Sequence, residues 1–191
     1  MMETQVKNQV TMPVSREPSF AQLIPAGDNR PRQVCTDCGF IAYENPKVVV
    51  GAVVTWGEQI LLCRRAIDPQ HGFWTLPAGF LEQHESAETG AQREAMEEAN
   101  AKIQIDTLLA AYTIPRLSQV QLIYRARLLD RAISPGIESL DVRLFDYADI
   151  PWSELAFPSV HWALTQFASV RHLSTFPAFS NPPGETGDHH P

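Results

Sequence analysis

Hydrophobic residues along the chain gather in short runs that are separated by turn residues. The first long run, at residues 47–55, is rich in valine, and its β-branched content predicts a buried strand. A turn at 56–58 precedes a second apolar run at 59–64, which we expect to return as a neighbouring strand. The same pattern predicts a short strand at 73–76, paired strands at 103–115 and 119–129, and another strand at 143–147.

Two segments have helical rather than strand periodicity. The first spans about residues 86–99, with Ser86 suited to its N-cap and Asn100 suited to the left-handed residue that ends it. The second is amphipathic and spans residues 159–170. Mixed strands with two principal helices predict an α/β/α sandwich.

The ends of the chain differ from this central region in composition. Residues 1–18 are polar and aperiodic, which predicts a disordered leader, and residues 19–46 form an extension rich in Pro, Asp and Asn. The structured domain is expected over residues 47–172. Residues 173–191 contain Pro-Pro, Gly and His-His and are expected to be a disordered tail.

Composition narrows the classes of function. The chain has 191 residues, enough for one domain with a small extension, and its hydrophobic content of 44% supports a core. A net charge of −7 argues against nonspecific binding to nucleic acid or to an anionic membrane. No apolar run approaches the length of a membrane span. Three cysteines without a secretion signal favour a reducing, cytoplasmic location.

The candidate chemistry lies in one motif that begins before the first helix and continues along it. It reads Gly79, five residues, Glu85, seven residues, then Arg93-Glu94, two residues and Glu97-Glu98. The last three acids share one helical face, where like charges destabilise an isolated helix. A divalent cation reverses that penalty, and hard cations such as Mg²⁺ prefer carboxylate oxygens.

This motif resembles the signature of the Nudix hydrolases, which cleave nucleoside diphosphates linked to another moiety. The resemblance covers about residues 47–172 and implies the Nudix α/β/α sandwich with a mixed sheet. It also implies Mg²⁺ or Mn²⁺ as cofactor and, by analogy, a homodimer. The implied metal ligands are the carboxylates of Glu94, Glu97 and Glu98 with the main-chain carbonyl of Ala78, whereas Glu85 is expected to brace Arg93.

The implied reaction is attack of water on phosphorus, and it needs a base. In many members of the family the base lies on a loop between late strands, outside the motif. The loop at residues 135–140 has this place in the sequence, and Glu138 is the candidate for the base or an extra metal ligand. Asp141 is the alternative.

Several residues could bind the substrate. Arg64 and Arg65 follow a strand and could reach phosphates, or they could be an exposed strand end. Trp74 is the candidate for stacking on a planar ring, as are Phe73 and Tyr112, although the core is the commoner place for such residues.

The extension resembles that of a Nudix subgroup with an N-terminal zinc ribbon. Cys35 and Cys38 form one Cys-x2-Cys pair, but a closed structural zinc site takes four ligands, and no second pair is present. We therefore expect substoichiometric zinc.

The subgroup resemblance, including residues 155–159, implies a substrate such as ADP-ribose or FAD, cleaved to AMP and a phosphorylated product. NADH pyrophosphatase activity is the alternative within the same chemistry. An alternative of another class is a non-catalytic module that senses nucleotides, although such modules usually lose the motif acids. A zinc-ribbon adaptor for nucleic acid is disfavoured by the acidic charge and the missing cysteine pair.

Overall fold

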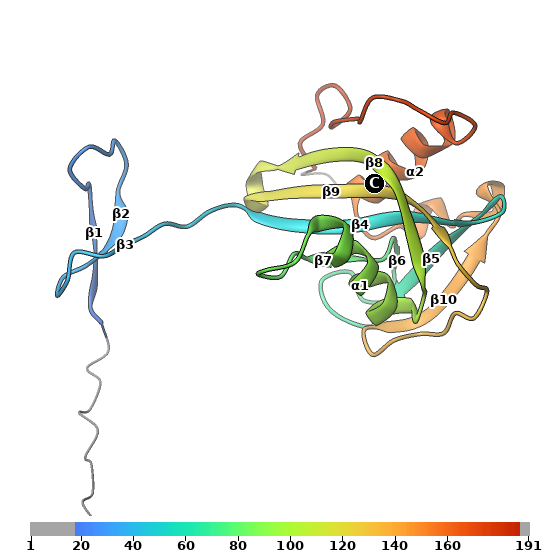
Figure 1. Ribbon diagram of the computed structural model, residues 1–191, viewed down its shortest axis with the longest axis horizontal. Coiled ribbons are helices and arrows are strands. Elements are labelled where there is room, and N and C mark those ends of the chain that lie inside the picture. The colour runs from blue at the N-terminus through green and yellow to red at the C-terminus, as the bar shows by residue number, and fades with distance from the viewer. Residues whose placement is uncertain (1–17, 188–191) are drawn as a thin grey trace, which may run out of the picture. The chain divides into compact units, whose positions relative to one another are not determined.

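The computed structural model describes residues 18–187 (Figure 1). The chain divides into two compact units between Asn45 and Pro46. The expected disordered leader, apart from its last residue, lies outside the described residues, as do the last four residues of the expected tail.

The N-terminal unit is a three-stranded antiparallel sheet in the order β1-β2-β3. Its strands are β1 (Phe20–Leu23), β2 (Arg32–Cys35) and β3 (Ile41–Ala42). An ion pair of 2.9 Å between Asp28 and Arg32 closes the turn between β1 and β2. The ribbon-like extension predicted from the sequence is confirmed.

The second unit is built on a mixed sheet, as predicted, and this sheet has seven strands. Five strands follow the order β10-β5-β4-β9-β8, while β6 pairs with β5 and β7 pairs with β4. The strands are β4 (Lys47–Trp56), β5 (Gln59–Arg65), β6 (Trp74–Thr75), β7 (Ala78–Phe80), β8 (Ile103–Ile114), β9 (Gln119–Leu128) and β10 (Ser139–Phe145). The sequence did not predict β7, and β10 begins earlier than expected.

The central strand β4 has different partners on its two edges. One edge pairs in parallel with β9 along its length, from Lys47 opposite Gln119 to Thr55 opposite Arg127. The other edge pairs first with β7, at residues 49–51, and only at its end with β5. The strands β4 and β5 therefore separate, and β7 brings the start of the acidic motif to the middle of the sheet.

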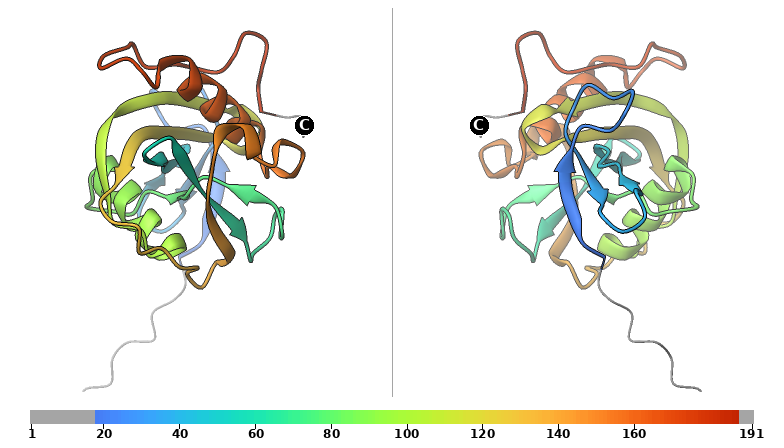
Figure 2. Two further views of the ribbon diagram at one scale, coloured as in Figure 1. Left: turned by 90° about the vertical axis from the view of Figure 1, so that its right-hand side faces the viewer. Right: turned by 90° about the vertical axis from the view of Figure 1, so that its left-hand side faces the viewer.

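Two helices cover opposite faces of this sheet, which confirms the predicted sandwich (Figure 2). Helix α1 (Ala87–Ala99) packs alanines against the small side chains of β4, and α2 (Pro158–Val170) packs larger apolar residues on the other face. Three short 3₁₀ helices complete the unit: η1 (Pro115–Leu117), η2 (Tyr147–Asp149) and η3 (Trp152–Glu154). No helix within residues 18–187 is long and apolar enough to cross a membrane.

Both ends of α1 are capped as the sequence predicted. The Ser86 hydroxyl accepts a hydrogen bond from the N–H of Thr89 at 3.2 Å, a cap that stabilises a helix by about 1 kcal/mol. Asn100 ends the helix in the left-handed region, with φ 49° and ψ 30°, and its N–H reaches the carbonyls of Ala95 and Met96.

Residues 173–187, expected to be disordered, pack against the sheet instead. Phe179 bridges to Ala110 of β8 through main-chain hydrogen bonds. The side chain of Asn181 exchanges hydrogen bonds with the backbone of Thr113 at 2.8 and 2.9 Å. The composition of the tail did not indicate these contacts. Through Phe179 and Asn181 the tail packs beside β8, the edge strand of the sheet.

Candidate active site

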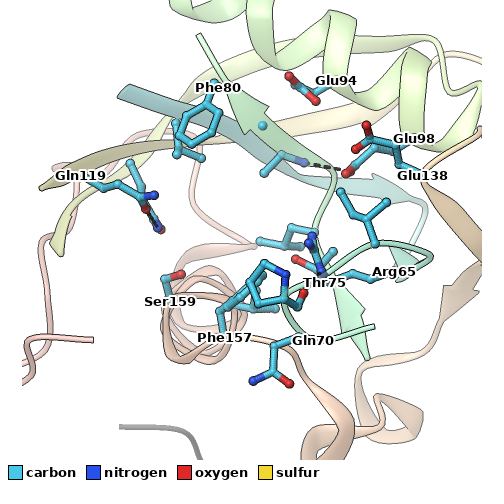
Figure 3. A pocket seen from close by; sticks show the side chains of 18 of the residues that line it. Arg65, Gln70, Thr75, Phe80, Glu94, Glu98, Gln119, Glu138, Phe157 and Ser159 are labelled. Carbon is cyan, nitrogen blue, oxygen red and sulfur yellow. Dashed lines mark hydrogen bonds between the residues drawn. The ribbon is translucent and has the colours of Figure 1, made fainter. Parts of the chain in front are cut away.

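A cleft of about 900 Å³ opens in the second unit, beside the acidic motif. Its walls come from β4, β7, α1, the η1 turn, the start of β9, the 134–138 loop and the start of α2 (Figure 3). Glu94, Glu98 and Glu138 lie on one side of the cleft, whereas Gln119 and Ser159 lie on the other. The cleft therefore has an acidic side and a side lined by amide, hydroxyl and apolar groups.

The three motif acids face the cleft with unequal exposure. Glu94 and Glu98 are buried, at 8% and 6% exposure, because they project from the face of α1 that packs against β7 and β10. Glu97 also lines the cleft, but its side chain is 58% exposed. Two of the three carboxylates are thus held in a poorly hydrated setting.

Burial disfavours ionisation of both inner acids. It raises the pKa of Glu94 above its ordinary value. It also raises the pKa of Glu98 to about 8, and the negative charges of Glu94 and Glu138 add to the effect. The N–H of Ala78, which donates to the Glu98 carboxylate at 3.1 Å, and the nearby Arg65 act in the opposite direction.

Arg93 holds the motif together on the outer side of these acids. Its guanidinium forms a two-point pair with Glu85, at 2.8 and 3.2 Å, which lowers the pKa of the Glu85 carboxyl. It also donates to Glu94 at 2.7 Å, to Glu97 at 3.0 Å and to the carbonyl of Phe80 at 3.0 Å. The expected contact between Glu85 and Arg93 is therefore present, and it ties the loop before α1 to the helix.

Gly79 lies directly against the carboxylate of Glu94. A Cβ atom at this position would lie 2.3–2.4 Å from the carboxylate of Glu94. The absence of a side chain at Gly79 lets that carboxylate rest against β7, facing the cleft. A side chain at this position would therefore displace the Glu94 carboxylate from its present place.

The donor set fits a hard divalent cation. Clustered carboxylates whose burial and mutual repulsion disfavour ionisation are stabilised when a cation joins them. Within residues 18–187, no three acidic, cysteine or histidine side chains are already arranged to hold a metal ion. Arg93 contacts one carboxylate oxygen of Glu94 and one of Glu97, which leaves the other oxygen of each carboxylate for a cation.

Glu138 reaches the cleft from a loop that is packed on the end of α1. A Cβ atom at Gly136 would lie 1.7 Å from the carbonyl oxygen of Glu97, so only glycine fits. The N–H of Gly136 donates to the carbonyl of Glu98 at 3.0 Å. Asp141, the alternative base, pairs with Arg143 at 2.6 Å and does not line the cleft.

Two of the expected substrate contacts are wrong. Trp74 is buried at 4% exposure and packs edge-on against Phe145, with ring centroids 5.0 Å apart, so it belongs to the core. Arg64 lies outside the cleft, and its Nε–H donates to the carbonyl of Gly72 at 2.8 Å. Alternation along β5 sends neighbouring side chains to opposite faces, and Arg65 is the one that enters the cleft.

Arg65 is fixed in the cleft by two contacts. Its Nε–H donates to the carbonyl of Pro69 at 2.8 Å, and its guanidinium lies 5.2 Å from the ring centre of Phe157. The charge of Arg65 also lowers the pKa of Glu98. The guanidinium therefore lies between the acidic side and the start of α2. A phosphate bound there would be stabilised by its positive charge.

Sequence reasoning pointed to residues 155–159 but missed two glutamines on the far side of the cleft. Gln119 and Gln121 are two apart on β9 and face the cleft together, with their amide groups 3.4 Å apart. The polar alternation at the start of β9 was the signal that could have identified them. Other lining residues that the sequence did not single out are Ile67, Gln70, Phe80, Ile114, Arg116, Leu117 and Ile123.

The cysteine pair of the N-terminal unit lies in a tight turn. Cys35 is buried and Cys38 is exposed, and both are free thiols. The neighbouring segment places Ser19 and Phe20 opposite Thr36 and Cys35 and adds no further cysteine. Two thiols leave a four-ligand zinc site incomplete.

Comparison with known proteins agrees with this geometry. The family model of the NUDIX domain matches residues 45–166, and the model of the zinc-ribbon segment described as Nudix N-terminal matches residues 18–44. A crystal structure of a NUDIX hydrolase from Nitrosomonas europaea is similar, with a TM-score of 0.80 and 47% identity over 85% of this chain and 93% of that one.

Two curated relatives are more distant. The ADP-ribose pyrophosphatase of Methanocaldococcus jannaschii is 28% identical over 119 residues, which are 60% of this chain and 69% of that protein. The NAD-capped RNA hydrolase NudC of Pseudomonas syringae pv. tomato is 31% identical over 110 residues, 56% of this chain and 38% of that protein. With the acidic motif on α1 and the matched domain models, the chain belongs to the Nudix hydrolase family, as an enzyme that acts on pyrophosphate bonds and carries the family's zinc-ribbon domain at its N-terminal side.

Proposed function

We propose that the chain hydrolyses the diphosphate of a dinucleotide such as ADP-ribose or FAD to AMP and a second phosphorylated product. The observation that carries this proposal is the two-sided cleft of about 900 Å³. Its acidic side suits a metal-bound diphosphate, and its far side offers amides and apolar surface to a nucleoside. The similarity to an ADP-ribose pyrophosphatase supports the same substrate class.

The residues of the acidic side have different roles in the proposed reaction. Glu94, Glu97 and Glu98 would hold Mg²⁺ or Mn²⁺, with the main-chain carbonyl of Ala78 as a further ligand. The cation, when bound, supplies positive charge to the diphosphate and lowers the pKa of the attacking water. Arg93 orients the outer faces of Glu94 and Glu97 through the contacts described above.

Glu138 is the proposed base that takes the proton from the attacking water. Like Glu98, it lines the cleft, and its negative charge raises the pKa of Glu98. Arg65 is the proposed phosphate contact, because its guanidinium faces the same space from β5.

NADH pyrophosphatase activity is the second candidate. It is favoured by the similarity to two NudC proteins, of which the one from Haemophilus influenzae is 38% identical over 73 residues. Both candidates share the diphosphate chemistry and differ in the groups bound on the far side of the cleft, so a comparison of NADH with ADP-ribose as substrate separates them.

The metal-binding role is tested by Glu98→Gln. The substitution keeps the size of the side chain and removes a charged ligand, so turnover of ADP-ribose with Mg²⁺ should fall about a hundredfold or more. Glu58→Gln is the matched control, since Glu58 is 84% exposed and pairs only loosely with Arg171 at 3.5 Å. Turnover of Glu98→Gln close to that of the control would refute the assignment.

A further inference from the structure

The loop that carries Glu138 is attached to the end of α1 by the side chain of Asn100. We propose that Asn100 is a positioning residue, which fixes Glu138 at the working distance from the metal-binding acids. The inference rests on the proposed role of Glu138 as the base, and it assigns a function to the residue that closes the helix.

The backbone at this position does not need an asparagine side chain. Asn100 adopts the left-handed conformation at the end of α1, and its N–H reaches the carbonyls of Ala95 and Met96. Glycine adopts this conformation at least as readily, because it has no Cβ atom. The helix stop by itself therefore does not account for the contacts that the amide of Asn100 makes.

Its amide reaches a segment 34 residues later in the chain. The Nδ2 atom lies 3.1 Å from the carbonyl oxygen of Ser134, 3.1 Å from the Ser134 hydroxyl and 3.4 Å from the carbonyl oxygen of Pro135. Both N–H bonds of the amide can be used by these acceptors. The side chain thus connects the helix end to the start of the Glu138 loop.

Main-chain contacts extend this connection toward Glu138. The N–H of Ser134 donates to the carbonyl of Ala99, and that of Gly136 donates to the carbonyl of Glu98, both at 3.0 Å. Beyond Gly136, the carbonyl of Glu138 accepts from the N–H of Ala66 at 2.8 Å. The loop is therefore fixed to the metal-binding helix at one end and to the strand carrying Arg65 at the other.

In this arrangement Asn100 can affect the reaction rate through the position of Glu138. Glu97 and Glu98 occupy the last turns of α1, and Glu138 faces them from the loop. A base must lie within hydrogen-bond reach of the water that it deprotonates, and a displacement of about 1 Å can cost a hundredfold in rate. Loss of the amide bonds would leave only the main-chain bonds of Ser134 and Gly136 to hold the start of the loop, so Glu138 would be placed less firmly while the helix itself remains capped.

Asn100→Gly tests the inference, because it keeps the left-handed backbone and removes only the amide. We expect thermal unfolding at or above the wild-type temperature, an unchanged KM and a kcat lowered about fivefold to tenfold, the size expected for one lost hydrogen-bonded contact. Ser134→Ala is the matched control. It removes the hydroxyl but leaves both carbonyl acceptors, so its kcat should stay near that of the wild type.

A double-mutant cycle shows whether the effect passes through Glu138. In a Glu138→Gln background, Asn100→Gly should lower kcat no further, because the base is already lost. An unchanged kcat for Asn100→Gly alone would overturn the inference and leave the role of Glu138 intact. A reduced kcat for Asn100→Gly together with an unchanged kcat for Glu138→Gln would overturn both the inference about Asn100 and the role of Glu138 as the base. Equal losses in the two backgrounds would show that Asn100 acts independently of Glu138 and would likewise overturn the inference.

Discussion

The Glu98 carboxyl is buried near the negative charges of Glu94 and Glu138, and this sets how the protein responds to pH. Its pKa of about 8 in the fold exceeds the ordinary value of 4.5. Between these values the metal-free folded protein retains a proton that the unfolded chain releases. The contribution of Glu98 to stability is therefore fully present below the lower value and is lost as the pH rises through about 8.

Thermal unfolding in the presence of a chelator measures this effect. We expect the wild-type protein to lose stability relative to Glu98→Gln as the pH is raised from about 6 to about 9, since glutamine carries no titratable proton. Added Mg²⁺ should oppose the loss for the wild type. Parallel pH profiles of the two proteins without metal would contradict the burial of an ionisable Glu98.

Arg64 and Arg65 form a matched pair of neighbouring arginines on opposite faces of β5. Arg65→Ala should raise KM for the dinucleotide about tenfold, because it removes a charged contact to phosphate. Arg64→Ala should leave KM unchanged, since Arg64 contacts the carbonyl of Gly72 outside the cleft. Steady-state kinetics of both variants tests the proposed contact between Arg65 and phosphate. Equal effects of the two substitutions on KM would contradict that contact.

At the scale of elements, the site depends on how the loop at residues 134–138 packs against α1. Gly136→Ala would place a Cβ atom against the carbonyl of Glu97, at a distance that no real contact tolerates. We expect a loss of about 1–3 kcal/mol in unfolding free energy, typical of overpacking, together with reduced kcat. Chemical denaturation and steady-state assays measure the two effects. Wild-type stability and turnover would show that the loop does not press on the helix end.

Much of the architecture follows from local signals in the sequence. Ser86 and Asn100 marked both ends of α1, and the valine-rich run marked β4, because capping and β-branched content act locally. Strand β7 was missed because Pro77 and Gly79 resemble a turn, and its pairing with β4 depends on a distant contact. The packing of residues 173–187 was missed for the same reason, since it depends on Ala110 and Thr113 of β8.

The acidic side of the cleft was predictable, whereas most of the far side was not. Glu94, Glu97 and Glu98 share a short motif with fixed spacing, so their common face follows from helix geometry. Whether Trp74 faces substrate or core depends on the burial of one face of β6, which a single sequence does not reveal. Gln119 and Gln121 lie far from the motif in the sequence and join it only through the parallel pairing of β9 with β4.

At the scale of the whole molecule, the N-terminal unit retains the ribbon fold with two thiols, Cys35 and Cys38. Elemental analysis of the purified chain should therefore give clearly less than one zinc per chain, and chelation should leave the unfolding temperature unchanged. A protein with Cys35→Ser and Cys38→Ser is the matched control and should show the same temperature. One tightly held zinc per chain would contradict this prediction and require ligands beyond the two cysteines.

The central claim is that the cleft acts on the diphosphate of a dinucleotide, and a substrate panel tests it most directly. The chain would be incubated with Mg²⁺ and, separately, with ADP-ribose, FAD, NADH and nucleoside triphosphates, and the products would be separated by chromatography, with Glu98→Gln as the blank. The predicted result is AMP and ribose 5-phosphate from ADP-ribose, with kcat/KM for ADP-ribose or FAD above that for any triphosphate, because the far side of the cleft offers a second group a place to bind. A triphosphate as the best substrate, with pyrophosphate as its product, would contradict the claim.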